Sequence, residues 1–413
     1  MEIQHRLAGR AKNKAPSPIR ELLKYLKIEG MISLGGGYPN PATFVFDKLN
    51  IHFKDGHEIE VTGEELTSAS QYGPSDAHPN LKNELLKWHQ FKDGVELKEN
   101  QIVVLNGCQE GLFIMAYLFQ NPGDKIIMSE PSYPGTLSAY KSFTNNFITV
   151  PIDSNGIRTD IVQHRLEDIK RAGEPLPKMI YTIPNGHNPG GVTLSIERRK
   201  HLIEIANRWD LIILEDDPYQ LVELDNKPKL PTIQSLDTEG RVVRLDSFSK
   251  IFAPGLRIGY ASGPTEIIRQ FVLFKQSANL HTSSFIQIVL SRYLQKAGFE
   301  GFSKLIRKNC EMYRINRDAM VAAAKKYLPA EVRYNIPGSG MFIWYELPQQ
   351  CNARRMIDQQ CEELKVLLVP GNAFSSQNGL ANYMRASFSM VTPEQIDEGI
   401  KRFAKMIKTE MNQ

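Results

Sequence analysis

The sequence predicts an α/β fold in which a mostly parallel sheet is sandwiched between helices. Short apolar segments alternate with amphipathic segments through the middle of the chain, and the apolar segments have no polar face. The segments expected to form strands of this sheet are Ile102–Leu105, Lys125–Met128, Met179–Ile183, Leu211–Leu214, Val242–Leu245 and Arg257–Ala261. Helices such as Gln109–Phe119 and Ile196–Trp209 are expected between them.

The last third of the sequence follows a different pattern, which predicts a smaller α+β domain. An amphipathic helix is expected at residues 302–326, and another helix at residues 393–411. Short strands are expected between them at Met341–Leu347, Val366–Val369 and Tyr383–Ser387. Near the other end, the turn-rich stretch SLGGGYPNP is typical of a linker. We therefore expect an N-terminal arm and linker at 1–45, a large domain at 46–298 and a small C-terminal domain at 299–413.

The composition is that of an ordinary soluble globular protein. The 413 residues are 41% apolar and 23% charged, and the formal net charge is only +4. Sparse cysteines without metal-like spacing predict a reduced, cytoplasmic protein that holds no metal. No apolar segment reaches the length of a membrane span, and we recognise no secretory signal. Basic residues gather near the N-terminus, which we interpret as a solvated arm rather than a nucleic-acid site.

A lysine and several anion-binding side chains occur together in the segment LDSFSKIFAPGLRIGY. Lys250 follows a predicted strand, where a buried amine is costly unless it is paired or has a chemical task. The hydroxyl groups of Ser247 and Ser249 and the guanidinium of Arg257 can together bind a phosphate group. A lysine after a strand is usually a surface cation, but an amine beside a phosphate site is what Schiff-base chemistry requires.

The segment LIILEDDPY leads from a predicted strand into three acidic residues. One interpretation is a strand that ends in a solvated acidic turn. The functional interpretation pairs Asp216 with the protonated nitrogen of a pyridine ring, so that the ring accepts electrons from the α-carbon of a substrate. The phenol of Tyr219, three residues further along, can donate a hydrogen bond to the 3-oxygen of the same ring.

Four further segments each carry a group suited to the same chemistry, although each alone is weak evidence. In IPNGHNPGG, Asn188 offers an amide donor to the ring oxygen, where the alternative is a simple loop. In VVLNGCQEG, the backbone amides of Cys108 and Gln109 open a helix and can bind an anion. Tyr133 in EPSYPG can stack on a flat cofactor or merely fill a turn. Arg385 in NYMRASFS can bind a carboxylate through two parallel hydrogen bonds, where the alternative is an ordinary surface arginine.

Taken together, these segments resemble the class I/II aminotransferases of the fold-type I family, which depend on pyridoxal 5′-phosphate (PLP). Five segments follow one another in the family's order: NPGG, EDDPY, SFSK, GLRIGY and YMRAS. The resemblance extends from PSPIR to the C-terminus. Within the family, the resemblance is greatest to the kynurenine/2-aminoadipate branch, which also includes aromatic and multi-substrate aminotransferases. The segments that indicate this branch are SPIR, MISLGGGYPNP, QYGPS, IPNGHNPGG, EDDPY and DSFSK. The resemblance implies a fold-type I architecture and a PLP cofactor.

The resemblance also implies a role for each chemically active residue. Lys250 forms the internal aldimine with PLP and then carries the proton. Asp216 pairs with the ring nitrogen, whereas Asn188 and Tyr219 hold the 3-oxygen of the ring. The groups implied to bind the phosphate are the amides of Cys108 and Gln109 with Ser247, Ser249 and Arg257. Cys108 stands where close relatives often have serine, so a hydroxyl contact is lost while the backbone amide remains.

Other implied contacts concern the ring faces, the partner subunit and the substrate. Tyr133 and Pro218 cover the two faces of the ring. Tyr72 in QYGPS reaches the phosphate of the partner subunit, which implies a homodimer. Arg385 is implied to hold the α-carboxylate of the substrate, and Asn188 is also implied to contact the substrate. Arg20 and the backbone near Gly37 and Tyr38 are implied to border the side-chain pocket.

The implied reaction is a ping-pong transamination of a 2-aminoadipate, kynurenine or aromatic amino acid, with 2-oxoglutarate as the 2-oxo acid. A PLP-dependent β-eliminating lyase is the alternative, because it shares nearly every cofactor-binding residue. A transcription regulator with this domain would need a DNA-binding module, for which we expect no room before PSPIR, and a non-catalytic module would be expected to lack Lys250. Arg20 favours an acidic or long polar substrate side chain, whereas SLGGGYPN equally suits an aromatic one.

Overall fold

The computed structural model describes residues 3–18, 25, 28–32, 34–35, 37–225, 227–377 and 379–412. The chain forms two compact units, and each is built from two stretches of the sequence. The first unit consists of Met1–Asn121 and Val243–Leu305, and the second consists of Pro122–Val242 and Ile306–Gln413. The domain boundaries expected at residues 45 and 298 stay a prediction. Within the described ranges, no helix has both the length and the apolar character needed to cross a membrane.

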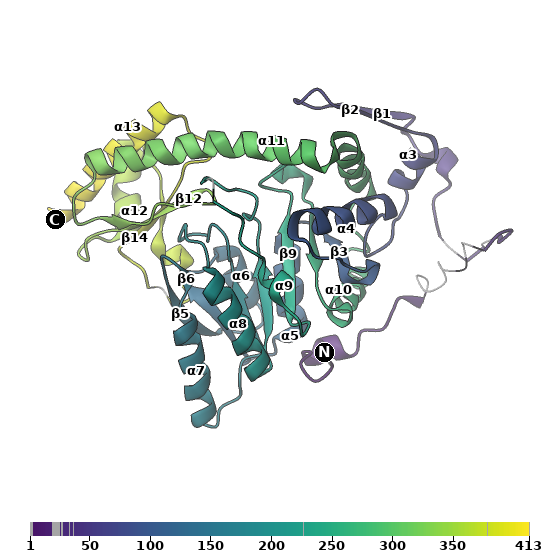
Figure 1. The fold of residues 1–413 in the computed structure, drawn as a ribbon, viewed down its shortest axis with the longest axis horizontal. Coiled ribbons are helices and arrows are strands. Elements are labelled where there is room, and N and C mark those ends of the chain that lie inside the picture. The colour runs from purple at the N-terminus through teal and green to yellow at the C-terminus, as the bar shows by residue number, and fades with distance from the viewer. Residues whose placement is uncertain are drawn as a thin grey trace. The chain divides into compact units, whose positions relative to one another are not determined.

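In the first unit, three strands are paired antiparallel. The central strand β10 (Gly259–Ser262) runs antiparallel to both β3 (Ile102–Leu105) and β9 (Val242–Ser247). The connection from β9 to β10 contains only the short 3-10 helix η4 (Pro254–Leu256), so the chain turns back instead of crossing over. The helices α4 (Pro79–Asp93), α5 (Cys108–Phe119) and α10 (Thr265–Ala278) contact β3 (Figure 1). The remaining elements are α1 (Gly9–Lys12), η2 (Pro41–Thr43), β1 (Lys48–His52), β2 (Glu58–Thr62), α3 (Gly63–Ser70) and η3 (Glu99–Gln101).

In the second unit, four neighbouring strands run parallel in the order β8, β7, β4, β5. Ile180 of β7 packs in the core beneath two helices, whereas its neighbour Met179 accepts a hydrogen bond through Sδ from Tyr140 on a third helix. Helices therefore cover both faces, and every residue of β7 and β8 is buried. The elements are β4 (Lys125–Glu130), α6 (Pro134–Lys141), β5 (Asn146–Asp153), β6 (Gly156–Ile157), α7 (Thr159–Arg171), β7 (Met179–Thr182), α8 (Ile196–Trp209), β8 (Ile212–Asp216) and α9 (Ile233–Leu236).

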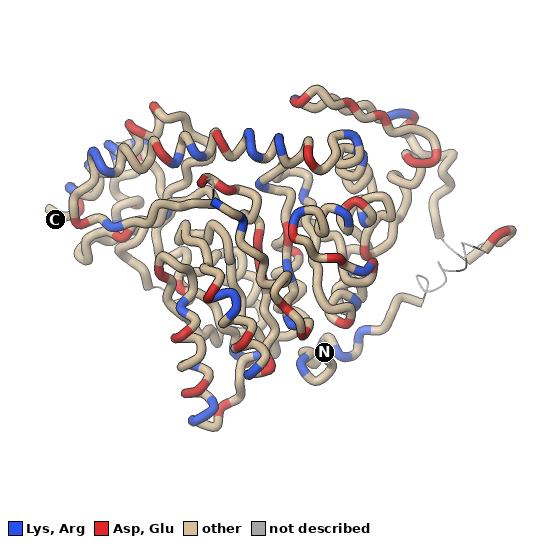
Figure 2. Tube along the Cα trace, in the orientation of Figure 1, with Lys and Arg blue, Asp and Glu red and all other residues tan. Residues whose placement is uncertain are grey.

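The helix α7 illustrates why such segments form outer layers. Val162 and Leu166 are fully buried in the core of the second unit. Charged residues of both signs follow the length of the helix (Figure 2), and its last turn ends with Lys170 and Arg171. An apolar stripe with an opposite charged face is the pattern of a helix that covers a sheet on one side only.

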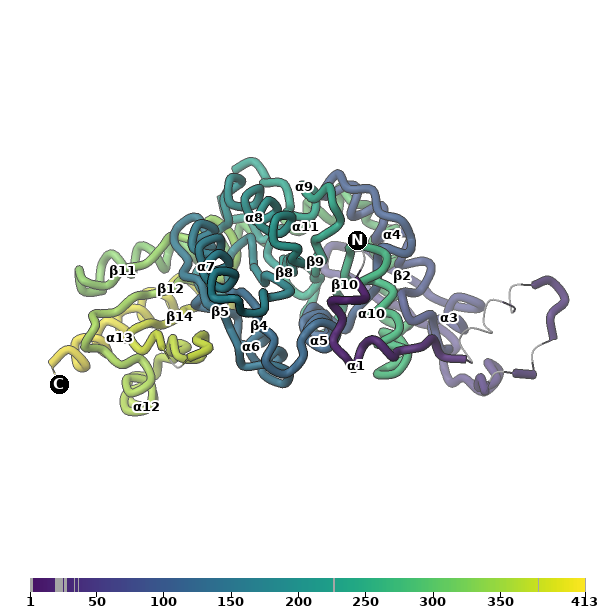
Figure 3. Tube along the Cα trace, turned by 90° about the horizontal axis from the view of Figure 1, so that it is seen from below, coloured from purple at the N-terminus to yellow at the C-terminus, as the bar shows by residue number. Residues whose placement is uncertain are grey.

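The second unit also contains a separate four-stranded antiparallel sheet in the order β11, β12, β14, β13. Two helices lie beside it (Figure 3), and the side chains of Ile343, Met384 and Phe403 belong to the shared core. The elements are β11 (Arg333–Tyr334), β12 (Phe342–Glu346), α12 (Ala353–Leu364), β13 (Val369–Pro370), η5 (Gly371–Phe374), β14 (Tyr383–Ser387) and α13 (Pro393–Met411).

The predicted α/β architecture is confirmed, but several elements differ in extent, two of them substantially. The predicted strand Val366–Val369 is wrong in extent, because only Val369 and Pro370 pair: Lys365 ends α12 in a left-handed conformation, and the next three residues have no regular structure. The predicted helix at 302–326 is part of α11 (Ser284–Tyr327), in which Gly298 has a non-helical φ of 64°. The predicted helix therefore corresponds to the part of α11 that follows this break.

Candidate active site

The strands of the second unit bring several predicted site residues to one edge of the parallel sheet. β4, β7 and β8 run in the same direction, so their carboxyl ends meet at that edge. Tyr133 follows β4, Asn188 follows β7, and Asp216 is the last residue of β8. This edge is where ligands bind in open α/β sheets, because the strand ends and their loops leave a crevice there.

Asp216 is a buried carboxylate at this edge. Its side chain is shielded from solvent, and Oδ2 accepts a hydrogen bond of 2.9 Å from the Tyr181 hydroxyl. Burial, and then the negative charge of Asp216, raise the pKa of Tyr219 far above its ordinary value. The phenol of Tyr219 therefore stays protonated and can act as a hydrogen-bond donor.

Arg385 is held next to Asn188 by two kinds of contact. Its Nη1 donates a hydrogen bond of 2.8 Å to Asn188 Oδ1. Its guanidinium carbon lies 4.2 Å from the ring centre of Phe342 and 5.0 Å from that of Phe374. Among the described residues, the buried Nε of Arg385 has no hydrogen-bond partner. A planar cation fixed in this way, with a donor still to be satisfied, suits a carboxylate ligand.

His187 lies in the same loop as Asn188, and the sequence interpretation of this loop does not include it. A backbone N–H can only donate, so His187 Nδ1 accepts from Gly190 at 3.2 Å, and Nε2 carries the proton and donates to Ser129 Oγ at 2.9 Å. Burial lowers the pKa of His187 to about 4, so the ring is neutral at pH 7. A histidine enclosed by turn residues beside Asn188 is the signal that could have identified it.

This histidine makes the loop sensitive to acid. The pKa of His187 in the folded protein lies below the value of about 6.5 in the unfolded chain, so its contribution to stability is full above pH 6.5. As the pH falls toward 4 the unfolded chain binds a proton that the folded loop does not, and we expect a loss of about 3 kcal/mol. Urea denaturation between pH 7 and pH 4 should show a shallower pH dependence for His187→Gln than for wild type.

A matched control replaces the exposed His164 of α7 with glutamine. That variant should lose stability with acidification as the wild-type protein does. Identical pH dependence for His187→Gln and wild type would contradict the lowered pKa of His187 in the folded loop.

In the first unit, predicted phosphate-binding groups gather where α5 begins. Gly107 precedes α5 with a φ of 78° and has no side chain to cap the helix. The Arg257 guanidinium lies against it, because a Cβ at Gly107 would be 2.6 Å from Arg257 Nη2. A Cβ at Gly259 would be only 3.3 Å from the amide nitrogen of Cys108. Gly259 pairs with Ser247 in the sheet, so the end of β9 and the start of α5 are neighbours.

The turn after β9 carries the remaining predicted groups of this unit. Ser247 Oγ accepts a hydrogen bond of 3.1 Å from the amide of Ser249, and Lys250 is the next residue. Gln109 is the second residue of α5. The structure therefore brings together Cys108, Gln109, Ser247, Ser249, Lys250 and Arg257 in the first unit, and Tyr133, Asn188, Asp216, Pro218, Tyr219 and Arg385 in the second.

The described residues predicted to lie near a partner subunit or the substrate side chain are exposed in the first unit. Tyr72 is 53% exposed, and its ring centre lies 6.2 Å from that of Tyr38. Gly37, next to Tyr38, is also exposed. Arg20 lies outside the described residues.

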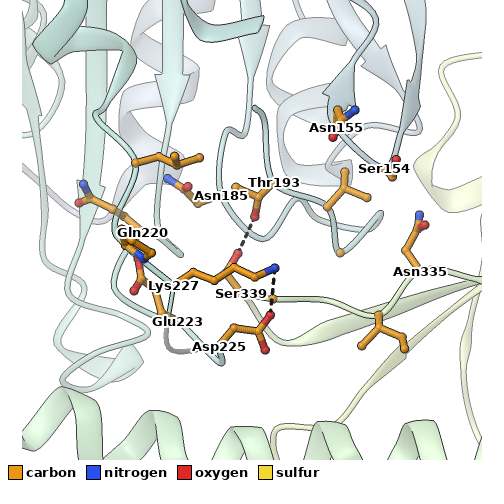
Figure 4. A pocket seen from close by; sticks show the side chains of 16 residues that line it. Ser154, Asn155, Asn185, Thr193, Gln220, Glu223, Asp225, Lys227, Asn335 and Ser339 are labelled. Atoms are coloured by element: carbon orange, nitrogen blue, oxygen red, sulfur yellow. Dashed lines mark hydrogen bonds and ion pairs between the residues drawn. The ribbon is translucent and has the colours of Figure 1, made fainter. Parts of the chain in front are cut away.

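A cavity of about 560 Å³ in the second unit does not coincide with the predicted site residues (Figure 4). Some of its polar groups are paired with one another: Thr193 Oγ1 is 2.9 Å from Ser339 Oγ, and Lys227 Nζ is 3.7 Å from an oxygen of Asp225. Asn185, also in its wall, donates to Asp217 at 2.8 Å. Because its lining includes none of the predicted site residues that the structure describes, the cavity is a poorer candidate than the strand-end residues.

Comparison with known proteins extends over nearly the whole chain. The family model for aminotransferase class I and II matches residues 57–403. The chain is 35% identical over 411 residues to aromatic-amino-acid aminotransferase 1 of Thermococcus litoralis, covering 100% of this chain and 96% of the relative. It is 36% identical over 411 residues to the mitochondrial kynurenine/alpha-aminoadipate aminotransferase of Mus musculus, covering 96% of each chain.

The solved structures lead to the same family. The crystal structure of Pyrococcus horikoshii kynurenine aminotransferase in complex with PMP superposes with a TM-score of 0.80 at 34% identity, covering 99% of this chain and 98% of that one. The fold is thus the fold-type I architecture, the protein is an aminotransferase, and its cofactor is PLP. The chain belongs to the class I and II aminotransferase family.

Proposed function

We propose that this aminotransferase moves the amino group of a 2-aminoadipate, kynurenine or aromatic amino acid to 2-oxoglutarate by a ping-pong mechanism. The substrate classes follow the names of the relatives in Thermococcus litoralis and Mus musculus. The observation that carries the proposal is Arg385, a mostly buried guanidinium that is hydrogen-bonded to Asn188 and retains an unsatisfied Nε within the described part of the chain. An α-carboxylate is common to every amino acid and 2-oxo acid, so one such group serves both half-reactions.

The donor set of the described residues fits PLP. A phosphate would be bound by the uncapped start of α5 and by Arg257, which lies so close to Gly107 that a Cβ there would be 2.6 Å from Nη2. Asp216 would pair with the ring nitrogen, and the protonated Tyr219 with Asn188 would donate to the ring oxygen. The other groups proposed to hold the cofactor are the amides of Cys108 and Gln109, the hydroxyls of Ser247 and Ser249, the amine of Lys250, and Tyr133 and Pro218 at the ring faces.

PLP supplies an aldehyde that exchanges with amines and a ring that accepts electrons from the α-carbon. The chain's own residues then have separate tasks. Arg385 would bind the α-carboxylate and orient the α-hydrogen. Lys250 Nζ would take that proton and deliver it to the 4′ carbon of the cofactor. The carboxylate of Asp216 would favour a proton on the ring nitrogen. We also propose that the active form is a homodimer, for which the exposure of Tyr72 leaves its hydroxyl available to a second copy.

Measuring glutamate formation from a panel of amino donors with 2-oxoglutarate tests this function. We expect activity with 2-aminoadipate, kynurenine or an aromatic amino acid, and parallel lines in double-reciprocal plots. In the absence of an acceptor, the enzyme should release one equivalent of 2-oxo acid and stop. Continuous release of pyruvate and ammonia without an acceptor would instead identify a β-eliminating lyase.

Replacing Arg385 with lysine should weaken substrate use severely. Lysine keeps the charge but cannot form the two-pronged contact with a carboxylate, nor can it stack in the same way on Phe342 and Phe374. We expect kcat/KM to fall by about a hundredfold, or about 3 kcal/mol, with most of the effect in KM. Steady-state kinetics with both substrates should show the loss for donor and acceptor alike. A loss for only one of them would argue against a shared carboxylate site.

A further inference from the structure

A buried ion pair lies behind the turn that opens α5. Lys275 of α10 is completely shielded from solvent, and its Nζ lies 3.3 Å from Glu110 Oε2 in the first turn of α5. The same Nζ donates to Thr282 Oγ1 at 2.9 Å. Burial lowers the pKa of Lys275, and Glu110 opposes that effect. A buried charge of this kind persists only where its partners are held in good geometry.

Glu110 connects this ion pair to the backbone of the turn. Its Oε2 accepts a hydrogen bond of 2.6 Å from the amide of Asn106, and its Oε1 accepts one of 2.6 Å from Asn279 Nδ2. The carbonyl of Asn106 in turn accepts from Arg257 Nη2 at 3.2 Å. Asn106 is therefore held through its N–H by Glu110 and through its C=O by Arg257.

The turn packs closely against its neighbours. A side-chain carbon at Gly107 would be 2.6 Å from Arg257 Nη2, and one at Gly259 would be 3.3 Å from the amide nitrogen of Cys108. No N-cap side chain holds the start of α5. The direction of the first amides of α5 thus depends on how Asn106 is held. Glu110 holds Asn106 by accepting the hydrogen bond of its backbone amide.

Lys275 also organises a second segment of the same unit. Its carbonyl accepts from the amides of Asn279 and Leu280 at 3.1 and 2.7 Å, which closes the turn after α10. The next residue, His281, accepts from the amide of Gly73 at 3.2 Å, and its ring lies 6.3 Å from that of Tyr72. The side chain of Lys275 thus contacts Glu110 of α5 and Thr282, the residue after His281.

We propose that Glu110 is a positioning residue for the phosphate of the cofactor: it orients the Asn106–Cys108 turn through the Asn106 amide, and Lys275 balances its buried charge. Neither residue contacts the phosphate. The inference rests on the proposed function, which assigns the phosphate to this turn and to Arg257.

Two double variants separate positioning from simple stabilisation. Changing one residue of the pair alone would leave a buried charge without its partner, and such a protein would be strongly destabilised. Glu110→Gln with Lys275→Met removes both charges but keeps a carbonyl that can accept from Asn106. Glu110→Leu with Lys275→Met removes both charges and the acceptor. The two proteins differ in whether residue 110 can accept hydrogen bonds from the Asn106 amide and from Asn279 Nδ2.

The measurement is the dissociation constant of each apoprotein for PLP and for pyridoxal, which lacks the phosphate, by fluorescence titration. We expect the preference for PLP over pyridoxal to fall about tenfold in Glu110→Leu/Lys275→Met, which is a typical effect of losing a residue that orients the groups around a bound ligand. In Glu110→Gln/Lys275→Met we expect the preference to stay near that of the wild type. Equal preference in the two double variants overturns the inference. A matched control, Glu65→Gln/Arg292→Met, removes an ion pair elsewhere in the unit and should leave the preference unchanged.

Arg257→Ala distinguishes failure of this inference from failure of the proposed function. If Arg257→Ala leaves the preference for PLP over pyridoxal intact, the phosphate does not bind at this turn and the proposed site is wrong. If Arg257→Ala abolishes that preference while the two double variants remain alike, the site stands and only the positioning role fails.

Discussion

Replacing Lys250 with alanine is expected to lower the rate of transamination by at least about 10⁴-fold, the upper end of what a positioned proton carrier contributes. The variant loses both the amine that holds the cofactor covalently and the group that moves the α-proton. Borohydride treatment followed by mass spectrometry should attach the cofactor to the wild-type protein but not to Lys250→Ala. Added small alkylamines should restore part of the activity, because they can carry the same proton.

Lys296→Ala is the matched control for this prediction. Lys296 is an exposed lysine of α11 in the same unit, so its removal should change neither the covalent attachment nor the rate. Turnover of Lys250→Ala near the wild-type rate would show that another residue carries the cofactor.

Asp216→Asn should reduce kcat by about 10²–10³-fold, the effect of removing one well-placed electrostatic group from an active site. Asparagine keeps an oxygen that can accept from Tyr181, so the buried hydrogen bond survives while the negative charge is lost. Without that charge the ring nitrogen releases its proton more easily, and removal of the α-proton slows. The kinetic isotope effect with an α-deuterated donor should therefore rise in this variant.

The neighbouring Asp217 provides the comparison. Asp217→Asn also removes a buried carboxylate from the end of the same strand while keeping an acceptor for Asn185. We expect no rise in the isotope effect for Asp217→Asn. A similar rise in both variants would mean that the negative charge of this region matters in general, rather than Asp216 in particular.

The apolar pattern of the sequence predicts where the central strands lie but not how they run. Ile102–Leu105 is β3 without any change, because four consecutive apolar residues bounded by polar ones leave little choice. The antiparallel course of β10 was not predicted, since strand direction is not encoded in burial. The lack of a helical pattern between β9 and β10 is the local signal for it. β5 was missed because Pro151 interrupts a half-exposed strand.

The site could be predicted where a residue's chemistry is itself the signal. Lys250, Asp216 and Arg385 have charged groups in or beside apolar strands, and such placement needs a reason. His187 and Glu110 could not be identified in the same way, because their importance lies in contacts with Ser129 and Asn106 that are distant along the chain or made through the backbone. A sequence pattern reports residue types, whereas these roles depend on which lone pair faces which N–H.

The pairing of β3 with β10 has a consequence for the protein during its synthesis. Val103 is synthesised well before Ala261, its partner in the sheet, and both residues are completely buried in the folded unit. At about 5–20 residues per second, the ribosome needs on the order of ten to thirty seconds to deliver that partner. Throughout this interval a short apolar strand has unpaired backbone groups, which makes it a site for chaperone binding and a starting point for aggregation. We therefore expect slower translation at low temperature to increase the yield of folded protein less than added chaperone does.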